Sequence, residues 1–180
     1  MLKTQLTKDI LDELLKGNID FSLKNKDELI KHVDGQNPKA IVITCSDSRV
    51  IPEFIFNRKI GEIFVIRVAG NVTIDPSILA SIEYGVDYLN IPLLIILGHS
   101  NCGAVKAAEE SIDCENPLLE EIKKGFSLND DHIIGNLKYQ YRMIFQRSKI
   151  ISNAVSDKKL KVIPAIYNIK KGKVEVLNFD

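Results

Sequence analysis

Apolar residues along this chain form short runs that alternate with stretches of helical spacing. The runs at 40–44 (AIVIT), 62–68 (EIFVIRV) and 91–97 (IPLLIIL) are rich in β-branched side chains and in leucine. Such runs are typical of strands buried on both faces of a parallel sheet. Two more runs, 162–169 and 174–179, flank Lys170-Lys171-Gly172-Lys173, and this arrangement predicts a hairpin.

Between these runs, apolar residues recur every three or four positions. Asp75-Pro76 suits the start of a helix, because Asp is a good N-cap and Pro is favoured in the first turn. The remaining periodic segments predict helices over 5–16, 26–33, 102–110 and 136–155.

Alternation of buried strands with helices predicts an α/β fold. We expect a mostly parallel central sheet of four strands plus an antiparallel edge strand, flanked by helices. The whole chain, 1–180, is expected to form a single domain. Residues 1–35 would be an N-terminal helical arm and residues 36–180 the α/β core.

Composition supports a soluble protein of one domain and narrows the possible partners. The chain has 180 residues, of which 45% are hydrophobic and 27% charged, and its formal net charge is zero. With no basic stripe or acidic tail, binding to nucleic acid or to an anionic membrane is not expected. The N-terminus has no secretory apolar region, and the 91–97 run is too short to span a bilayer.

Cysteine content points to a reducing compartment. Three cysteines in a chain of this size do not form a disulfide framework, so a cytoplasmic location is expected. Cys114 lies in a polar stretch, SIDCENP, and we interpret it as a bystander.

Metal-binding residue types follow two of the predicted strands. Cys45 comes directly after 40–44, and His99 and Cys102 come shortly after 91–97. The carboxyl ends of neighbouring parallel strands meet at one edge of a sheet, so these side chains are expected to converge. Two thiolates and an imidazole suit zinc, and three protein ligands leave the fourth position open, as in catalytic sites. The sequence therefore predicts a reactive metal centre.

Asp47 and Arg49 lie two and four residues after the first thiol. A zinc ion with two thiolates and a neutral imidazole has zero formal charge, so it should acidify water less than a three-histidine site. Arg49 could stabilise negative charge, and Asp47 could hold a bound water through a hydrogen bond. Alternatively, Asp47 could itself take the fourth position and close the site until it pairs with Arg49.

Taken singly, these residues have more ordinary interpretations. A buried cysteine at a strand end is usually a small apolar residue, and a lone histidine is more often hydrogen-bonded than a ligand. Asp47 and Arg49 alone would read as an ion pair in a loop. Their combination at two matching strand ends favours the metal centre.

Two segments, CSDSRV at 45–50 and GHSNCGAV at 98–105, resemble the zinc motifs of the β-class carbonic anhydrases. FVIRVAGN at 64–71, SIEYGVDYL at 81–89 and the C-terminal part extend the resemblance over residues 20–177. It implies Cys45, His99 and Cys102 as ligands of one Zn²⁺ per subunit. It also implies that Asp47 and Arg49 form a catalytic dyad.

The same resemblance implies a substrate pocket. Gln36 would be a polar group near the substrate, and Gly103 would offer its backbone N–H. The apolar lining for CO₂ would come from Phe64, Ala69 and Tyr84. Ordinary core packing is the alternative for the apolar members.

The activity implied is that of a lyase. Zinc-bound hydroxide would attack CO₂ and give bicarbonate and a proton, reversibly. A homodimer or a tetramer is implied, with N-terminal helices packing on a partner subunit and active sites at the interface. One alternative is a hydrolase of carbonyl sulfide or carbon disulfide on the same scaffold. Another is a non-catalytic, zinc-stabilised regulatory or binding protein whose four-ligand site is permanently closed.

Overall fold

The computed structural model describes residues 2–73, 75–111 and 115–179, so Cys114 lies outside the described residues. The chain divides into two compact units, residues 1–36 and residues 37–180. No helix in the described ranges combines the length and the apolar character needed to cross a membrane.

The N-terminal unit consists of α1 (Leu2–Lys24) and α2 (Lys26–Ile30). Helix α1 is longer than the predicted 5–16. It continues through Gly17 and Asn18, residue types that are common at helix ends, and reaches Lys24. From Leu6 onward, its large apolar side chains are at least 45% exposed: Leu6, Ile10, Leu11, Leu14, Leu15, Ile19, Phe21 and Leu23.

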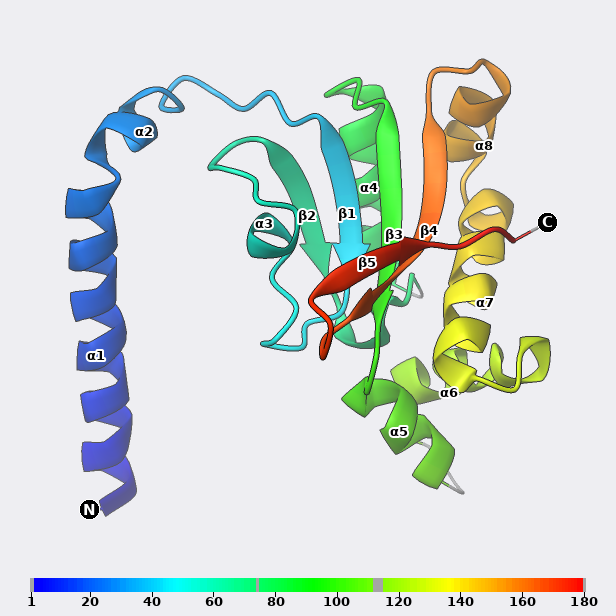
Figure 1. Cartoon of the computed structure of the whole chain (residues 1–180), viewed down its shortest axis with the longest axis horizontal. Helices are drawn as coiled ribbons and strands as arrows, with labels where there is room; N and C mark the ends of the chain where they lie inside the picture. The colour runs from blue at the N-terminus through cyan, green and yellow to red at the C-terminus, as the bar shows by residue number, and fades with distance from the viewer. Residues whose placement is uncertain (1, 74, 112–114, 180) are drawn as a thin grey trace. The chain divides into compact units, whose positions relative to one another are not determined.

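The second unit is built on a five-stranded sheet with the order β2-β1-β3-β4-β5 (Figure 1). The strands are β1 (Ala40–Thr44), β2 (Ile63–Arg67), β3 (Leu93–His99), β4 (Lys161–Asn168) and β5 (Lys173–Val176). β1 to β4 pair in parallel and β5 is antiparallel to β4. The predicted mostly parallel sheet with an antiparallel edge strand is therefore confirmed.

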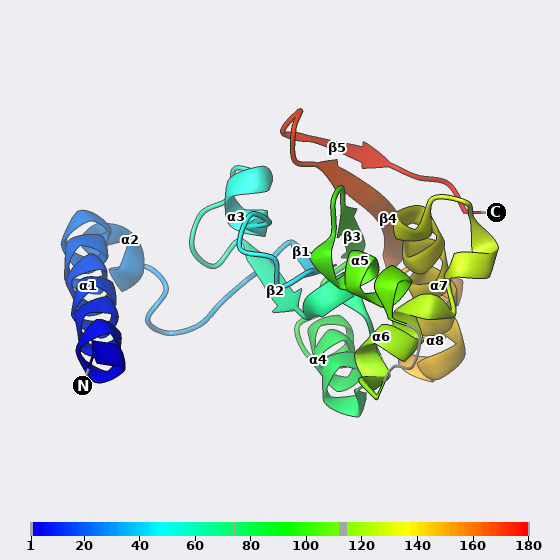
Figure 2. The same ribbon diagram turned by 90° about the horizontal axis from the view of Figure 1, so that it is seen from below.

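The two faces of this sheet are covered unequally, as Figure 2 shows from below. Helices α4 (Pro76–Asp87), α7 (His132–Arg147) and α8 (Lys149–Ser156) pack on one face and form the main core with Ile43 and Ile96. Val42 and Leu97, one residue along each strand, point to the other face. There they meet a smaller cluster that includes Ile55 at the end of α3 (Pro52–Ile55).

Short elements gather beyond the carboxyl ends of the strands. They are the single turn η1 (Ala69–Asn71) after β2, helix α5 (Gly103–Glu110) after β3, helix α6 (Pro117–Lys123) and the turn η2 (Phe126–Leu128). A buried cluster joins the first three, through Val72, Val105 and Ile122. These elements build the edge at which Cys45 and Cys102 lie.

Other predicted boundaries also need correction. The helix expected over 26–33 ends at Ile30. β3 covers Leu93–His99 rather than 91–97, because Pro92 has no N–H to give to the ladder. The single helix expected over 136–155 is two helices. Ser148 separates them: its backbone is extended (φ −123°, ψ 113°), and its hydroxyl caps α8 by accepting from the N–H of Ile151. The last strand ends at Val176 instead of residue 179.

Candidate metal centre

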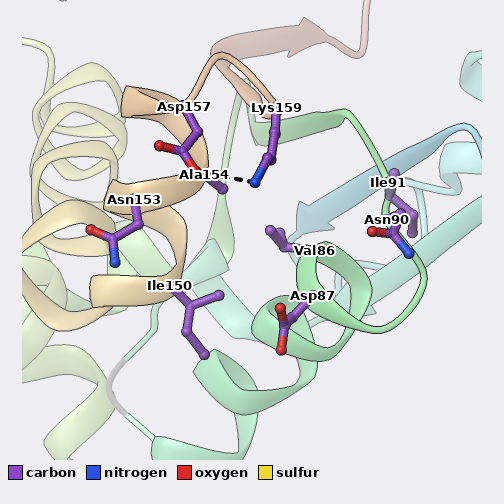
Figure 3. Close-up of a pocket in the computed structure, with 9 residues that line it drawn as sticks. All are labelled: Val86, Asp87, Asn90, Ile91, Ile150, Asn153, Ala154, Asp157 and Lys159. Atoms are coloured by element: carbon purple, nitrogen blue, oxygen red, sulfur yellow. Dashed lines mark hydrogen bonds and ion pairs between the residues drawn. The ribbon is translucent and has the colours of Figure 1, made fainter.

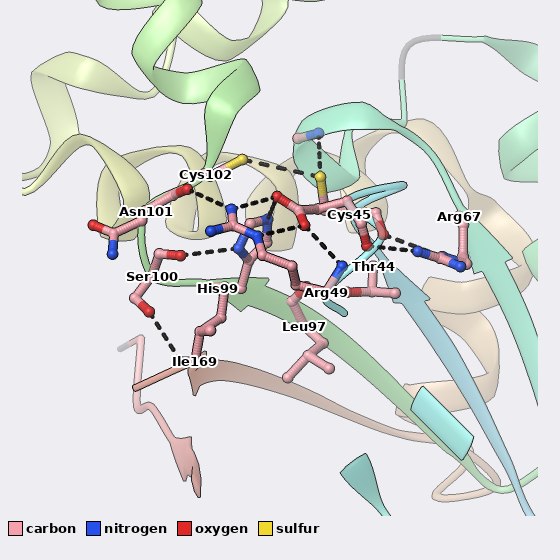
Figure 4. Close-up of polar contacts among 12 residues, drawn as sticks. Thr44, Cys45, Arg49, Arg67, Leu97, His99, Ser100, Asn101, Cys102 and Ile169 are labelled. Atoms are coloured by element: carbon pink, nitrogen blue, oxygen red, sulfur yellow. Dashed lines mark hydrogen bonds and ion pairs between the residues drawn. The ribbon is translucent and has the colours of Figure 1, made fainter. Parts of the chain in front are cut away.

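Strand pairing brings the two motifs together. β1 and β3 are parallel neighbours in which Thr44 pairs with Leu97, so the residues that follow them share one edge of the sheet. The Thr44 hydroxyl donates to the Leu97 carbonyl at 2.8 Å and fixes this alignment (Figure 4). Cys45 follows β1, whereas His99 is the last residue of β3 rather than lying beyond the strand. Cys102 occupies the N-cap of α5, as the sequence predicted.

The donor atoms of Cys45, His99 and Cys102 all lie within 4.8 Å of one another, and all three residues are buried. The two sulfurs are 4.0 Å apart. Zn–S bonds of about 2.3 Å in a tetrahedron place two sulfurs about 3.8 Å apart. The geometry therefore fits a zinc ion with only slight adjustment.

The imidazole of His99 is oriented for metal binding. Its Nδ1 lies 3.0 Å from the Ser100 carbonyl oxygen, to which it donates as Nδ1–H. Its Nε2 is buried and has no hydrogen-bond partner among the described residues. A buried polar atom without a partner is costly, and a metal ion would satisfy it.

The two thiols influence each other's ionisation. A hydrogen bond from Cys102 lowers the pKa of Cys45, assisted by the backbone N–H of Gly70, 3.3 Å from the Cys45 sulfur. Conversely, the hydrogen bond with Cys45 and burial raise the pKa of Cys102. One of the two thiols thus ionises readily. A cation between the sulfurs would stabilise the second thiolate.

Asp47 and Arg49 form a bidentate ion pair beside these ligands. Arg49 Nε lies 2.9 Å from Asp47 Oδ1, and Nη2 lies 2.6 Å from Oδ2. Nη2 also donates to the carbonyl of Asn101 at 3.1 Å, which links the two motifs. The hydrogen bonds from Arg49 hold the pKa of Asp47 well below its usual range. Asp47 Oδ2 lies 4.0 Å from His99 Nε2, so the carboxylate faces the ligand cluster.

Arg67, the last residue of β2, is a contributor that the sequence interpretation missed. Its side chain donates to the carbonyl of Cys45 at 3.3 Å and to that of Asp47 at 2.7 Å. These bonds hold the loop that carries the first thiol and the carboxylate. No local sequence signal marks Arg67, because it is placed level with the site by its register opposite Thr44 in the sheet.

The structure distributes the expected pocket residues unevenly. Ala69 is next to Gly70 in η1 and hence beside the Cys45 sulfur. Gly103 opens α5, is exposed, and has no atoms within 4 Å of where a Cβ would stand. Gly103 therefore leaves space beside Cys102.

Phe64 and Tyr84 lie together but away from the ligands of their own subunit. Their ring centroids are 6.3 Å apart. Phe64 pairs with Ile41, four residues before Cys45, which is roughly 13 Å along a strand. Gln36 is exposed and belongs to the N-terminal unit. The core unit by itself does not bring these three residues to the metal ligands.

A separate cavity of 490 Å³ lies where β3 and β4 begin, at the opposite edge of the sheet (Figure 3). It is lined by the ends of α4 and α8 and the residues after them: Val86, Asp87, Asn90, Ile91, Ile150, Asn153, Ala154, Asp157 and Lys159. Lys159 donates to Asp157 at 3.1 Å. None of these lining residues is a cysteine or a histidine, so this cavity offers no comparable ligand set.

Comparisons with known proteins agree with one another. The family model described as carbonic anhydrase matches residues 40–174. Carbonic anhydrase 2 of Mycobacterium tuberculosis is 34% identical, with 77% of this chain and 74% of that protein covered. A carbonic anhydrase of Pseudomonas aeruginosa is 30% identical, with 95% and 87% covered.

Solved structures give the same result for the fold. A Coccomyxa β-carbonic anhydrase in complex with acetazolamide has a TM-score of 0.78 at 27% identity, with 93% of this chain and 84% of that chain covered. One of two tetrameric β-carbonic anhydrases from Sordaria macrospora has a TM-score of 0.83 at 23% identity, with 95% and 98% covered.

Proposed function

The chain belongs to the β-class carbonic anhydrase family, and from this premise we propose that Cys45, His99 and Cys102 hold one zinc ion per subunit for the reversible hydration of CO₂ to bicarbonate and a proton. The single observation that carries the proposal is the buried Nε2 of His99, which has no hydrogen-bond partner in the described part of the chain and lies beside two sulfurs 4.0 Å apart. Both sulfurs bind metal only when reduced, so we place the protein in the cytoplasm.

Zinc, when bound, supplies a Lewis acid that lowers the pKa of water from about 15.7 toward 7. Asp47 accepts a hydrogen bond from the attacking water and orients it, since its carboxylate is held ionised by Arg49. Arg49 keeps Asp47 directed at the ligands and, with half of its side chain exposed, offers positive charge where bicarbonate forms. The formed Asp47–Arg49 pair supports an open fourth position rather than one occupied by Asp47.

The CO₂ pocket is proposed to be shared between subunits. Ala69 and the backbone N–H of Gly103 lie on the same subunit as the ligands. Phe64 and Tyr84 lie at another level of their own sheet. We therefore assign the apolar wall to Phe64 of the partner subunit and Tyr84 of the partner subunit. A polar contact would come from Gln36, which belongs to the N-terminal unit.

The exposed face of α1 supports the proposal of a second copy. Leu11, Leu14 and Leu15 are 54%, 67% and 55% exposed, and an isolated helix with such a face is marginal in water. We propose that α1 packs on a partner subunit in a homodimer or a tetramer. Sedimentation of a Leu11→Gln/Leu14→Gln variant should show dissociation, whereas the control Lys8→Gln/Lys16→Gln should keep the wild-type mass. Equal masses for both variants would contradict this packing.

The decisive experiment combines metal analysis with stopped-flow measurement of CO₂ hydration on reduced protein. We expect one zinc per chain and activity that is lost on chelation and recovered with zinc. Zinc at full stoichiometry without hydration would instead favour a non-catalytic zinc protein. Turnover of carbonyl sulfide or carbon disulfide well above that of CO₂ would favour the hydrolase.

A further inference from the structure

Four polar side chains are buried behind the metal centre without belonging to it. Glu121 on α6, Asn136 and Gln140 on α7, and Thr73 after η1 are each at most 2% exposed. Burial of so many polar groups is costly unless their hydrogen bonds are satisfied. Their partners show what this network holds.

Two residues one helical turn apart on α7 grip the segment that follows β2. Asn136 Nδ2 donates to the carbonyl of Gly70 at 2.9 Å. Gln140 Oε1 accepts from the backbone N–H of Thr73 at 3.1 Å and from its hydroxyl at 3.2 Å. Gln140 Nε2 donates to Asn136 Oδ1 at 3.3 Å, so the two amides orient each other.

The network continues to a charged anchor. Arg147 Nη1 donates to the carbonyl of Thr73 at 2.9 Å, and its guanidinium pairs with the Glu121 carboxylate. Glu121 also accepts from Lys124 at 2.8 Å. Thr73 is thus fixed through its N–H, hydroxyl and carbonyl, by residues of α7 that are themselves anchored to α6.

The gripped segment needs such support because its backbone is strained at Asn71. Asn71 has φ +48°, in the left-handed region that residues other than glycine seldom adopt, and such a conformation persists where the surroundings enforce it. Gly70, at φ +65°, adopts this region without strain. A Cβ at Gly70 would lie 2.6 Å from the side chain of Ile122, so glycine suits this position.

This strained turn directs one group at the metal centre. The N–H of Gly70 donates to the Cys45 sulfur at 3.3 Å, and the carbonyl of the same residue is the one that Asn136 holds. An N–H donated to a thiolate withdraws electron density from sulfur and fixes its direction. The position of Asn136 therefore determines a contact made by a metal ligand.

We propose that Asn136 and Gln140 are positioning residues of the metal centre: they hold Gly70 so that its N–H donates to the Cys45 sulfur, and they thereby tune the strength of that sulfur as a ligand. This inference rests on the proposed zinc site. It assigns a role in that site to residues which touch neither metal nor substrate.

The test uses cobalt(II) as a spectroscopic substitute for zinc in the full-length protein. In Asn136→Ala, the thiolate-to-cobalt charge-transfer band should move to lower energy, because the sulfur loses its N–H donor. Competition with a chelator should show zinc affinity about 10-fold weaker, the usual scale for removing a group that supports a metal ligand. Gln140→Glu, close to isosteric, keeps the acceptor for Thr73 but loses the donor to Asn136, so it should give a smaller shift in the same direction.

The matched control is Asp131→Ala. Asp131 caps the same helix by accepting from the N–H groups of Ile133 and Ile134. Its loss should lower the melting temperature while leaving the cobalt band and zinc affinity unchanged. If Asn136→Ala fails to fold, the cobalt band and the zinc affinity of Gln140→Glu, compared with those of Asp131→Ala, test the positioning role.

The outcomes separate the two proposals. Wild-type protein that takes up neither cobalt nor zinc would remove the proposed function itself. Wild-type metal binding, together with unchanged band and affinity in folded Asn136→Ala or Gln140→Glu, would overturn only the positioning role. A band shift in Asp131→Ala equal to that of Asn136→Ala would also overturn it, because general loosening of α7 would then explain the effect.

Discussion

The edge of the central sheet at which the parallel strands begin (the amino edge) differs from the edge at which they end (the carboxyl edge). Cavity volume does not reveal this difference. At the amino edge lies a cavity of 490 Å³ in which Asp157 and Lys159 pair with each other. At the carboxyl edge, the side chains of Cys45, His99 and Cys102 are buried, and their donor atoms lie within 4.8 Å of one another. There, one imidazole nitrogen has no hydrogen-bond partner among the described residues, and the sulfurs of two thiols lie 4.0 Å apart.

A buried polar atom without a hydrogen-bond partner among the described residues, rather than cavity volume, therefore marks the edge that carries the proposed site. Charged groups at the amino edge are more than half exposed, so water satisfies them. Cys45, His99 and Cys102 at the carboxyl edge are shielded from water, and a cation could satisfy their donor atoms. Mutations at the two edges should therefore have very unequal effects.

The largest effect is expected from His99→Ala or Cys102→Ala. Either change removes one of three ligands, so zinc content should fall close to zero. Hydration activity should fall about 1,000-fold or more, since several kcal/mol of Lewis-acid assistance are lost and each ~1.4 kcal/mol is tenfold in rate. Cys114→Ala is the matched control and should keep both zinc and activity. Full zinc content in His99→Ala would contradict the assignment of the metal site to the carboxyl edge.

A smaller loss is expected for Arg49→Ala. Zinc content should stay near one per chain because Arg49 is no ligand, whereas activity should fall about 100-fold with loss of the oriented Asp47 carboxylate. Arg58→Ala serves as the control, since Arg58 pairs with Glu62 at the surface. Wild-type turnover in Arg49→Ala would show that the ion pair is only a loop contact.

The network behind the carboxyl edge should appear in the pH dependence of stability. Burial raises the pKa of Glu121, but hydrogen bonds from Lys124 and Arg147 outweigh it and the pKa is lowered from 4.5. A carboxyl with a depressed folded-state pKa stabilises the protein fully above its unfolded value, and this stability is lost as pH falls through the folded pKa. Urea unfolding should thus show Glu121→Gln less stable by about 2 kcal/mol at pH 7, with the gap closing below pH 4.5. A gap that stays constant down to acid pH would contradict this account.

The smallest effect is expected at the amino edge. In Asp157→Ala/Lys159→Ala, activity should stay within about twofold of wild type and stability within about 0.5 kcal/mol, as for exposed ion pairs. Stopped-flow assays and thermal melts check both. A large loss of activity would show that the cavity takes part in catalysis.

Much of this contrast could be predicted from local sequence, and the reasons are physical. AIVIT is a strand at its predicted bounds because a continuous β-branched run has few other stable conformations. The convergence of Cys45, His99 and Cys102 could be predicted, because residues that follow two neighbouring parallel strands meet at the same edge of the sheet.

Contacts between distant residues escaped the sequence interpretation. Arg67 binds carbonyls 20 and 22 residues away, and Asn136 binds Gly70 across 66 residues. Such pairs follow from packing of the folded chain and leave no local pattern. Ser148 also escaped notice, because it fits a helical pattern and reveals its capping role only once its neighbours are in place.

The hydrogen bond between the Thr44 hydroxyl and the Leu97 carbonyl has a consequence for how an ion enters the protein. It fixes the alignment of β1 and β3, which carry Cys45 and His99 at their ends. The distance between the Cys45 sulfur and the His99 imidazole is therefore set by the pairing of the two strands. Metal binding should consequently need little rearrangement of the backbone. It should be fast, change the far-ultraviolet circular dichroism very little, and cost little conformational entropy.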